Sequence, residues 1–70
     1  MQWKRHDKYA EVSEDGRYSV AAYGTGDGWK FEGWRTRAHK DGPHLVCANV
    51  TAEEARQHCE ADALETAGDL

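Results

Sequence analysis

Three turn signals divide the first fifty residues of this chain into short segments, and their spacing limits the folds that the chain can adopt. The signals are Ser-Glu-Asp-Gly-Arg at residues 13–17, Gly-Thr-Gly-Asp-Gly at 24–28 and Lys-Asp-Gly-Pro at 40–43. Each is rich in residues that favour turns, and the segments between them are rich in Tyr, Trp, Val and Phe, which favour strands. The pattern predicts strands at about 2–12, 17–23, 29–37 and 45–50.

The segment after the last expected strand has the pattern of a helix start. Thr51-Ala52-Glu53-Glu54 forms a capping box, in which Thr51 is the N-cap and Glu54 reaches back to it. We expect a helix from about residue 52 to about 66, ending near Gly68. Residues 1–70 should therefore form one small α+β domain, an antiparallel three- to four-stranded β-meander with one C-terminal α-helix packed on one face.

The turn chemistry also predicts the strand register. A three-residue loop at 14–16, with Gly16 in the left-handed conformation, would pair Val12 with Tyr18. A four-residue loop at 24–27 would pair Ala22 with Trp29. Together these registers place one apolar set on a single face of the sheet: Ala10, Val12, Tyr18, Val20, Ala22, Trp29 and Phe31. A helix face of small residues would cover that set: Ala52, Ala55, Cys59, Ala63 and Thr66. The opposite, outer face of the sheet would carry Tyr9, Glu11, Ser19, Ala21, Tyr23, Lys30, Glu32 and Trp34.

The chain has few aliphatic residues for its length. It contains four valines, three leucines and no isoleucine among 70 residues, so its seven aromatic residues must supply much of the buried area. Such a thin core predicts either a marginally stable monomer or a homodimer. No apolar run is long enough to span a membrane, and the polar start MQWKRHDKYA is unlike a signal peptide. We therefore expect a cytoplasmic protein with reduced cysteines.

Motifs for catalysis and for cofactor binding are missing from the sequence. The glycines at 24–28 precede a segment with the pattern of a strand, whereas a phosphate-binding loop precedes a helix. The histidines are scattered, with no recognisable serine–histidine–aspartate or cysteine–histidine context. His44, Cys47, His58 and Cys59 match no zinc pattern, and two buried thiols facing each other account better for the cysteines. We expect no enzyme activity, no catalytic residue, no metal site and no cofactor.

The charge distribution favours a binding function. Residues 1–40 hold eight Lys or Arg and six Asp or Glu, whereas residues 41–70 hold one Arg and seven acids. Such an asymmetry can steer partners. We expect an acidic helix and exposed aromatic side chains to bind a protein partner, and the candidate residues are Glu53, Glu54, Glu60, Leu64, Glu65, Tyr9, Tyr23 and Trp34. The alternative is DNA or RNA binding by the outer sheet face through Arg17, Lys30, Arg35 and Arg37. A third interpretation is that the aromatic side chains only cover their cross-strand neighbours.

The segment Val50-Thr51-Ala52-Glu53-Glu54-Ala55-Arg56, after a meander that contains Asp15-Gly16-Arg17-Tyr18-Ser19-Val20, carries two resemblances. It resembles the DNA-binding domains of the AP2 type and of phage integrase N-termini, which implies a sheet that inserts basic side chains into the major groove. The sheet here mixes acids with bases, and only Arg17, Lys30, Arg35 and Arg37 fit that character. In size, acidity and layout the chain also resembles small phage and mobile-element proteins, among them anti-CRISPR inhibitors. That resemblance implies a stoichiometric inhibitor of a host nucleic-acid-handling complex. We expect the helix acids to occupy a basic groove of that complex while Trp34 and Tyr23 anchor on a second surface.

Overall fold

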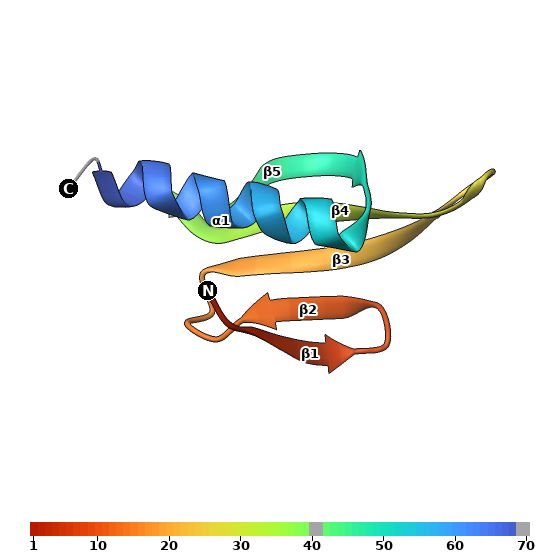
Figure 1. The fold of residues 1–70 in the computed structure, drawn as a ribbon, viewed down its shortest axis with the longest axis horizontal. Coiled ribbons are helices and arrows are strands. Elements are labelled where there is room, and N and C mark those ends of the chain that lie inside the picture. The colour runs from red at the N-terminus through yellow and green to blue at the C-terminus, as the bar shows by residue number, and fades with distance from the viewer. Residues whose placement is uncertain (40–41, 69–70) are drawn as a thin grey trace.

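The fold is a single antiparallel sheet with one helix on one face. A computed structural model describes the backbone of residues 1–39 and 42–68. It describes the side chains of residues 1–36 and 42–65. The elements are β1 (Trp3–Asp7), β2 (Ala10–Ser13), β3 (Tyr18–Thr25), β4 (Gly28–His39), β5 (Gly42–Val50) and α1 (Ala52–Gly68). The strands pair in the order β1-β2-β3-β4-β5, and α1 packs against β3, β4 and β5 (Figure 1). The predicted α+β class, the meander and the C-terminal helix are confirmed, but the sheet has five strands instead of three or four.

The additional strand arises because the segment expected as one strand over 2–12 folds back on itself. β1 ends at Asp7, which pairs with Ala10 of β2, so that Lys8 and Tyr9 form the turn. The Asp7 carboxylate accepts a hydrogen bond from the Tyr9 backbone N–H at 2.7 Å. Aspartate side chains commonly stabilise turns by bonding the backbone two residues further on. The turn carries no glycine or proline, which explains why the turn signals of the sequence do not include it.

The first predicted register is wrong by one residue. Val12 pairs with Ser19 and Glu11 pairs with Val20, so the loop after β2 is one residue longer than predicted. The Ser13 hydroxyl donates to Asp15 Oδ1 at 2.7 Å and accepts from the Tyr18 backbone N–H at 3.0 Å, which fixes the longer loop. Gly16 has the predicted left-handed conformation, with φ of 76°.

This shift exchanges the two faces of β2. Paired residues share a face of the sheet, and Val20 is buried beneath α1. Glu11 and the buried Ser13 therefore face the helix, whereas Ala10 and Val12 lie on the outer face, contrary to the prediction. A one-residue slip reverses every side chain of a strand, which is why so small an error in loop length had this effect.

The hairpin between β3 and β4 is longer than predicted. Its loop contains two residues instead of four, since Thr25 pairs with Gly28, and Trp29 pairs with Gly24 instead of Ala22. Trp29 stays on the predicted face but lies nearer the tip, where the hairpin projects past the N-terminal end of α1 (Figure 1). Its side chain is 60% exposed, so it does not belong to the core as predicted.

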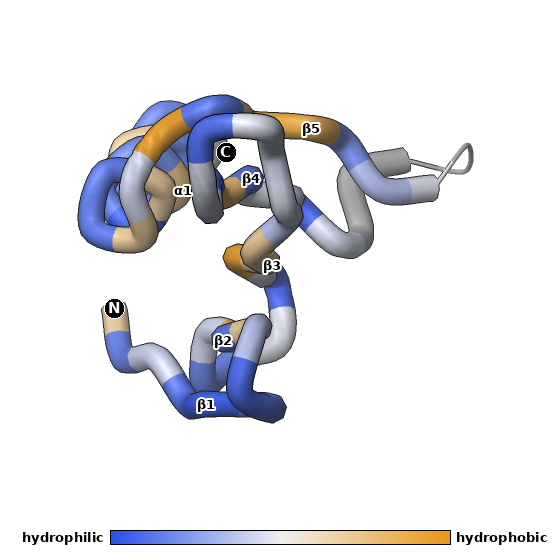
Figure 2. Tube along the Cα trace, turned by 90° about the vertical axis from the view of Figure 1, so that its right-hand side faces the viewer, coloured by the Kyte–Doolittle hydropathy of each residue, from blue (hydrophilic) through white to orange (hydrophobic). Residues whose placement is uncertain are grey.

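The core lies between α1 and the half of the sheet that it covers, strands β3, β4 and β5. Tyr18, Val20, Ala55 and Cys59 are fully buried. The small helix face is therefore confirmed for Ala55 and Cys59, which allow a close approach of α1 to the sheet. The side chain of Thr66 lies outside the described residues. The β1–β2 hairpin is largely hydrophilic (Figure 2), and long side chains link it to α1, Trp3 to Glu60 and Glu11 to Arg56.

The helix begins as its sequence predicts. The Glu54 backbone N–H donates to Thr51 Oγ1 at 3.1 Å, and the Thr51 backbone N–H donates to Glu54 Oε1 at 3.1 Å. These two bonds complete the capping box. The hydrogen bond from the Thr51 backbone lowers the pKa of the Glu54 carboxyl, because it stabilises the charged form.

Candidate binding surfaces

The four acids proposed for partner binding have different surroundings in α1. Glu53 and Glu65 are exposed, whereas Glu54 belongs to the capping box. Glu60 is half-buried and accepts a long hydrogen bond of 3.5 Å from the indole N–H of Trp3. Glu53 and Glu65 are therefore the two of these acids that are fully available to a partner.

Leu64 is the most exposed of the large apolar side chains that the structure describes, at 77%. It lines a hollow of about 380 Å³ together with Met1, Glu60 and Ala63. Met1 is also exposed. The hollow is therefore lined by the apolar side chains of Met1, Ala63 and Leu64 and by the carboxylate of Glu60. It lies between the start of the chain and the second half of α1.

The three aromatic residues proposed as anchors are not brought together. Trp34 pairs with Ser19 and Leu45 on the outer face of the sheet, where it is half-buried. Tyr23 lies on that face too, and its hydroxyl accepts a hydrogen bond from the Asn49 backbone N–H at 2.8 Å. Tyr9 instead lies on the helix side of the sheet, where it stacks on Trp29.

The basic residues proposed for the alternative nucleic-acid surface are dispersed as well. Arg17 is exposed in the loop between β2 and β3, and Lys30 lies on the outer face of the sheet. Arg35 faces the helix, where its Nε lies 3.4 Å from Asp62 Oδ2. This contact is an ion pair without hydrogen-bond geometry, since Arg35 Nε has no hydrogen-bond partner. The side chain of Arg37 lies outside the described residues.

The Asp62 carboxylate joins the helix to the sheet. Besides the ion pair with Arg35, it accepts a hydrogen bond of 2.7 Å from the hydroxyl of the fully buried Tyr18. A second link joins Arg56 of α1 to Glu11 of β2 at 2.6 Å. Both pairs are largely shielded from water, so they orient the helix on the sheet.

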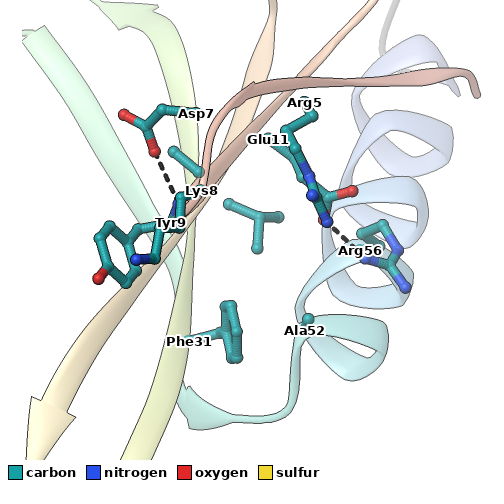
Figure 3. A pocket seen from close by; sticks show the side chains of 10 residues that line it. Arg5, Asp7, Lys8, Tyr9, Glu11, Phe31, Ala52 and Arg56 are labelled. Carbon is teal, nitrogen blue, oxygen red and sulfur yellow. Dashed lines mark hydrogen bonds and ion pairs between the residues drawn. The ribbon is translucent and has the colours of Figure 1, made fainter.

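A surface that the sequence interpretation missed lies at the other end of α1. The rings of Tyr9 and Trp29 stack with their centroids 5.3 Å apart and an interplanar angle of 23°. Lys8 Nζ lies 5.3 Å from the centroid of the Tyr9 ring. Next to Tyr9 is a hollow of about 170 Å³, whose wall includes Arg5 and Arg56 (Figure 3). The sequence interpretation missed this surface because it placed Tyr9 and Trp29 on opposite faces of the sheet and did not include the turn after Asp7.

The side chains of the buried Cys59 and the half-buried Cys47 both lie close to Gly33. A Cβ atom on Gly33 would lie 2.8 Å from Cys59 Sγ and 3.0 Å from Cys47 Sγ. The two sulfur atoms are therefore close neighbours above Gly33. Burial raises the pKa of the Cys47 thiol. Burial, together with the nearby Cys47, Asp62 and Glu60, raises the pKa of the Cys59 thiol to about 12. Both thiols are therefore protonated at neutral pH and poorly suited to act as nucleophiles.

Metal ligands are not clustered in the part of the chain that the structure describes, which contains no group of three His, Cys, Asp or Glu side chains able to hold an ion. Among the described residues, α1 is too short and too polar to cross a membrane. No protein-family model matches the chain, and neither a curated protein nor a solved structure matches it.

Proposed function

We propose that this protein is a non-enzymatic protein-binding module whose contact surface is the acidic side of α1. The observation that carries the proposal is Leu64, which is 77% exposed beside a hollow that Met1 and Glu60 also line. Protein interfaces commonly have an apolar centre and a polar rim. Glu53 and Glu65 extend the negative charge along the same helix.

The charge of this surface indicates the kind of partner. A partner with a basic groove would gain electrostatic complementarity from the helix acids, and Leu64 would supply apolar contact area. We propose that binding occludes such a groove, so that the protein acts as a stoichiometric inhibitor of a host nucleic-acid-handling complex. Protonated thiols and the dispersed histidines support a binding role over catalysis.

The test is affinity capture from a lysate of the native host, in nuclease-treated and untreated halves, followed by mass spectrometry. Two variants remove separate parts of the surface: Leu64→Asn removes the apolar anchor, and Glu53→Lys with Glu65→Lys reverses the exposed charge. The control, Asp27→Lys with Glu32→Lys, makes the same change of net charge away from the helix. We avoid Glu54 and Glu60, because both contribute to the fold.

The proposal expects one protein that the wild type and the control capture in both halves. Each helix variant should weaken that binding about tenfold or more, as anchor residues of interfaces do. Reversal of the helix charge should also flatten the salt dependence of binding. Equal capture by all variants, or loss of the captured protein on nuclease treatment, would disprove a protein interface on α1.

A further inference from the structure

The surface formed by Tyr9, Trp29 and Lys8 has an open aromatic platform. Trp29 is 60% exposed and Tyr9 is 47% exposed, although the two rings stack on each other. Tyr9 covers one face of the Trp29 ring, and the rest of that ring is open to solvent. Lys8 Nζ, over the Tyr9 ring, places a positive charge next to the platform.

Cations outnumber carboxylates around the hollow beside this platform. Arg5, Lys8 and Arg56 line the hollow together with the carboxylates of Asp7 and Glu11. Glu11 is paired with Arg56, so Asp7 is the one carboxylate of this lining left to offset Arg5 and Lys8. Arg5 and Lys8 have no carboxylate partner among the described residues. Figure 3 shows Arg5 reaching toward the Glu11–Arg56 pair across the hollow from Tyr9. The platform and the two cations therefore occur together on one surface.

From this arrangement we infer that the protein binds single-stranded nucleic acid through the surface of Arg5, Lys8, Tyr9 and Trp29. Each nucleotide carries a flat base and an anionic phosphate, which match an exposed ring beside cations. Stacking tolerates any base because every base has a π-face. An acidic peptide would find charge here too, but protein anchors insert into closed and well-packed pockets, whereas this platform is open.

The inference concerns a different surface from the proposed function and does not rest on it. Leu64 lies at the hollow that Met1 and Glu60 line, whereas this site is formed by β1, the β1–β2 turn and the start of β4. The net charge of −4 limits affinity for phosphates, so the site should act on a few nucleotides at low salt.

The experiment is a fluorescence-anisotropy titration with labelled oligothymidylate and oligouridylate of about 12 nucleotides, a length that covers a small single-strand site. It is repeated between roughly 50 and 200 mM salt. The variants are Trp29→Ala and Arg5→Gln with Lys8→Gln. The matched control is Lys4→Gln, which removes a charge from the same strand but on the outer face, opposite Val12. Circular dichroism confirms that each variant is folded.

We expect saturable binding of at least one oligonucleotide by the wild type. Trp29→Ala should weaken it about tenfold or more, since one base loses its stacking partner. The double glutamine variant should reduce the slope of log K against log salt by about 1.4, which corresponds to two single-strand phosphate contacts. Lys4→Gln and Leu64→Asn should both bind within about twofold of the wild type, because neither lies on this surface.

Three results would overturn the inference. The first is the absence of saturable binding at the lowest salt. The second is equal binding by the wild type and Trp29→Ala. The third is binding of a labelled acidic, tryptophan-containing peptide in the same assay without binding of either oligonucleotide, which would assign the surface to a protein ligand. None of these results bears on the capture of a partner through Leu64.

Discussion

Gly33 offers the sharpest test of how this small core is packed. It lies in β4 directly beneath α1, and an added Cβ would approach Cys59 Sγ to 2.8 Å and Cys47 Sγ to 3.0 Å. Non-bonded carbon atoms normally stay about 3.5–4.0 Å apart and sulfur is larger than carbon, so Gly33→Ala must displace the two cysteine side chains or the elements that carry them, α1 and β5. Overpacking of this kind typically costs about 1–3 kcal/mol.

A partial compensation must be subtracted from that cost. Alanine loses less backbone entropy on folding than glycine and is better by about 0.5–1 kcal/mol within a strand. We therefore expect Gly33→Ala to lower the free energy of unfolding by about 1–2 kcal/mol. In a domain of 70 residues this corresponds to a fall in Tm of roughly 5–15 °C.

Urea denaturation followed by tryptophan fluorescence, with thermal melts by circular dichroism, measures this effect. Gly26→Ala is the matched control, because its added Cβ would have no atom within 4 Å, and it should change stability by less than about 0.5 kcal/mol. Cys59→Ala makes room for the methyl group of Gly33→Ala. The double variant should therefore be more stable than the sum of the single changes predicts, with a coupling of about 0.5–3 kcal/mol.

Two outcomes contradict this account of the packing. Gly33→Ala with the stability of the wild type would mean that α1 does not lie so close to β4. An additive double-mutant cycle would mean that the lost stability comes from somewhere other than contact with Cys59.

Three further predictions concern the helix and its thiol. Thr51→Ala should lower the free energy of unfolding by about 1 kcal/mol in urea melts, whereas Thr51→Ser should retain most of it, because only the alanine lacks the capping oxygen. Asp62→Ala should lower it by about 1–3 kcal/mol, since it removes the carboxylate that accepts the Tyr18 hydroxyl and forms the ion pair with Arg35; an unchanged urea midpoint would refute this. The pKa of Cys59 is raised in the folded protein, so the unfolded chain ionises first and stability should fall as pH rises above the ordinary thiol value of 9.0, less steeply in Cys59→Ala.

Several features follow from local chemistry and could be predicted from the sequence. The capping box at Thr51 fixes the start of the helix, and Gly16 adopts the left-handed conformation in the loop between β2 and β3. The small side chains of Ala55 and Cys59 identify the face of α1 that is buried. Each depends on residues within one or two helical turns or one loop, so the information is contained in a short stretch of sequence.

Other features depend on contacts between distant segments, and only the tertiary structure decides them. The hydrogen bonds of Ser13 to Asp15 and Tyr18 lengthen one loop by one residue, which turns Glu11 toward Arg56 of the helix. Loop propensity alone does not distinguish the two lengths, because both satisfy the same turn residues.

The sites of candidate function show the same division. The sequence by itself determined that α1 is acidic on its outer side and carries Leu64 there, because helical periodicity assigns residues to faces. The tertiary structure alone decided that Tyr9 and Trp29 meet beside Arg5 and Lys8. That meeting requires the turn after Asp7 and a β3–β4 hairpin that extends past the helix. Both depend on strand register. A change of one residue in loop length turns the side chains of a strand to the opposite face of the sheet.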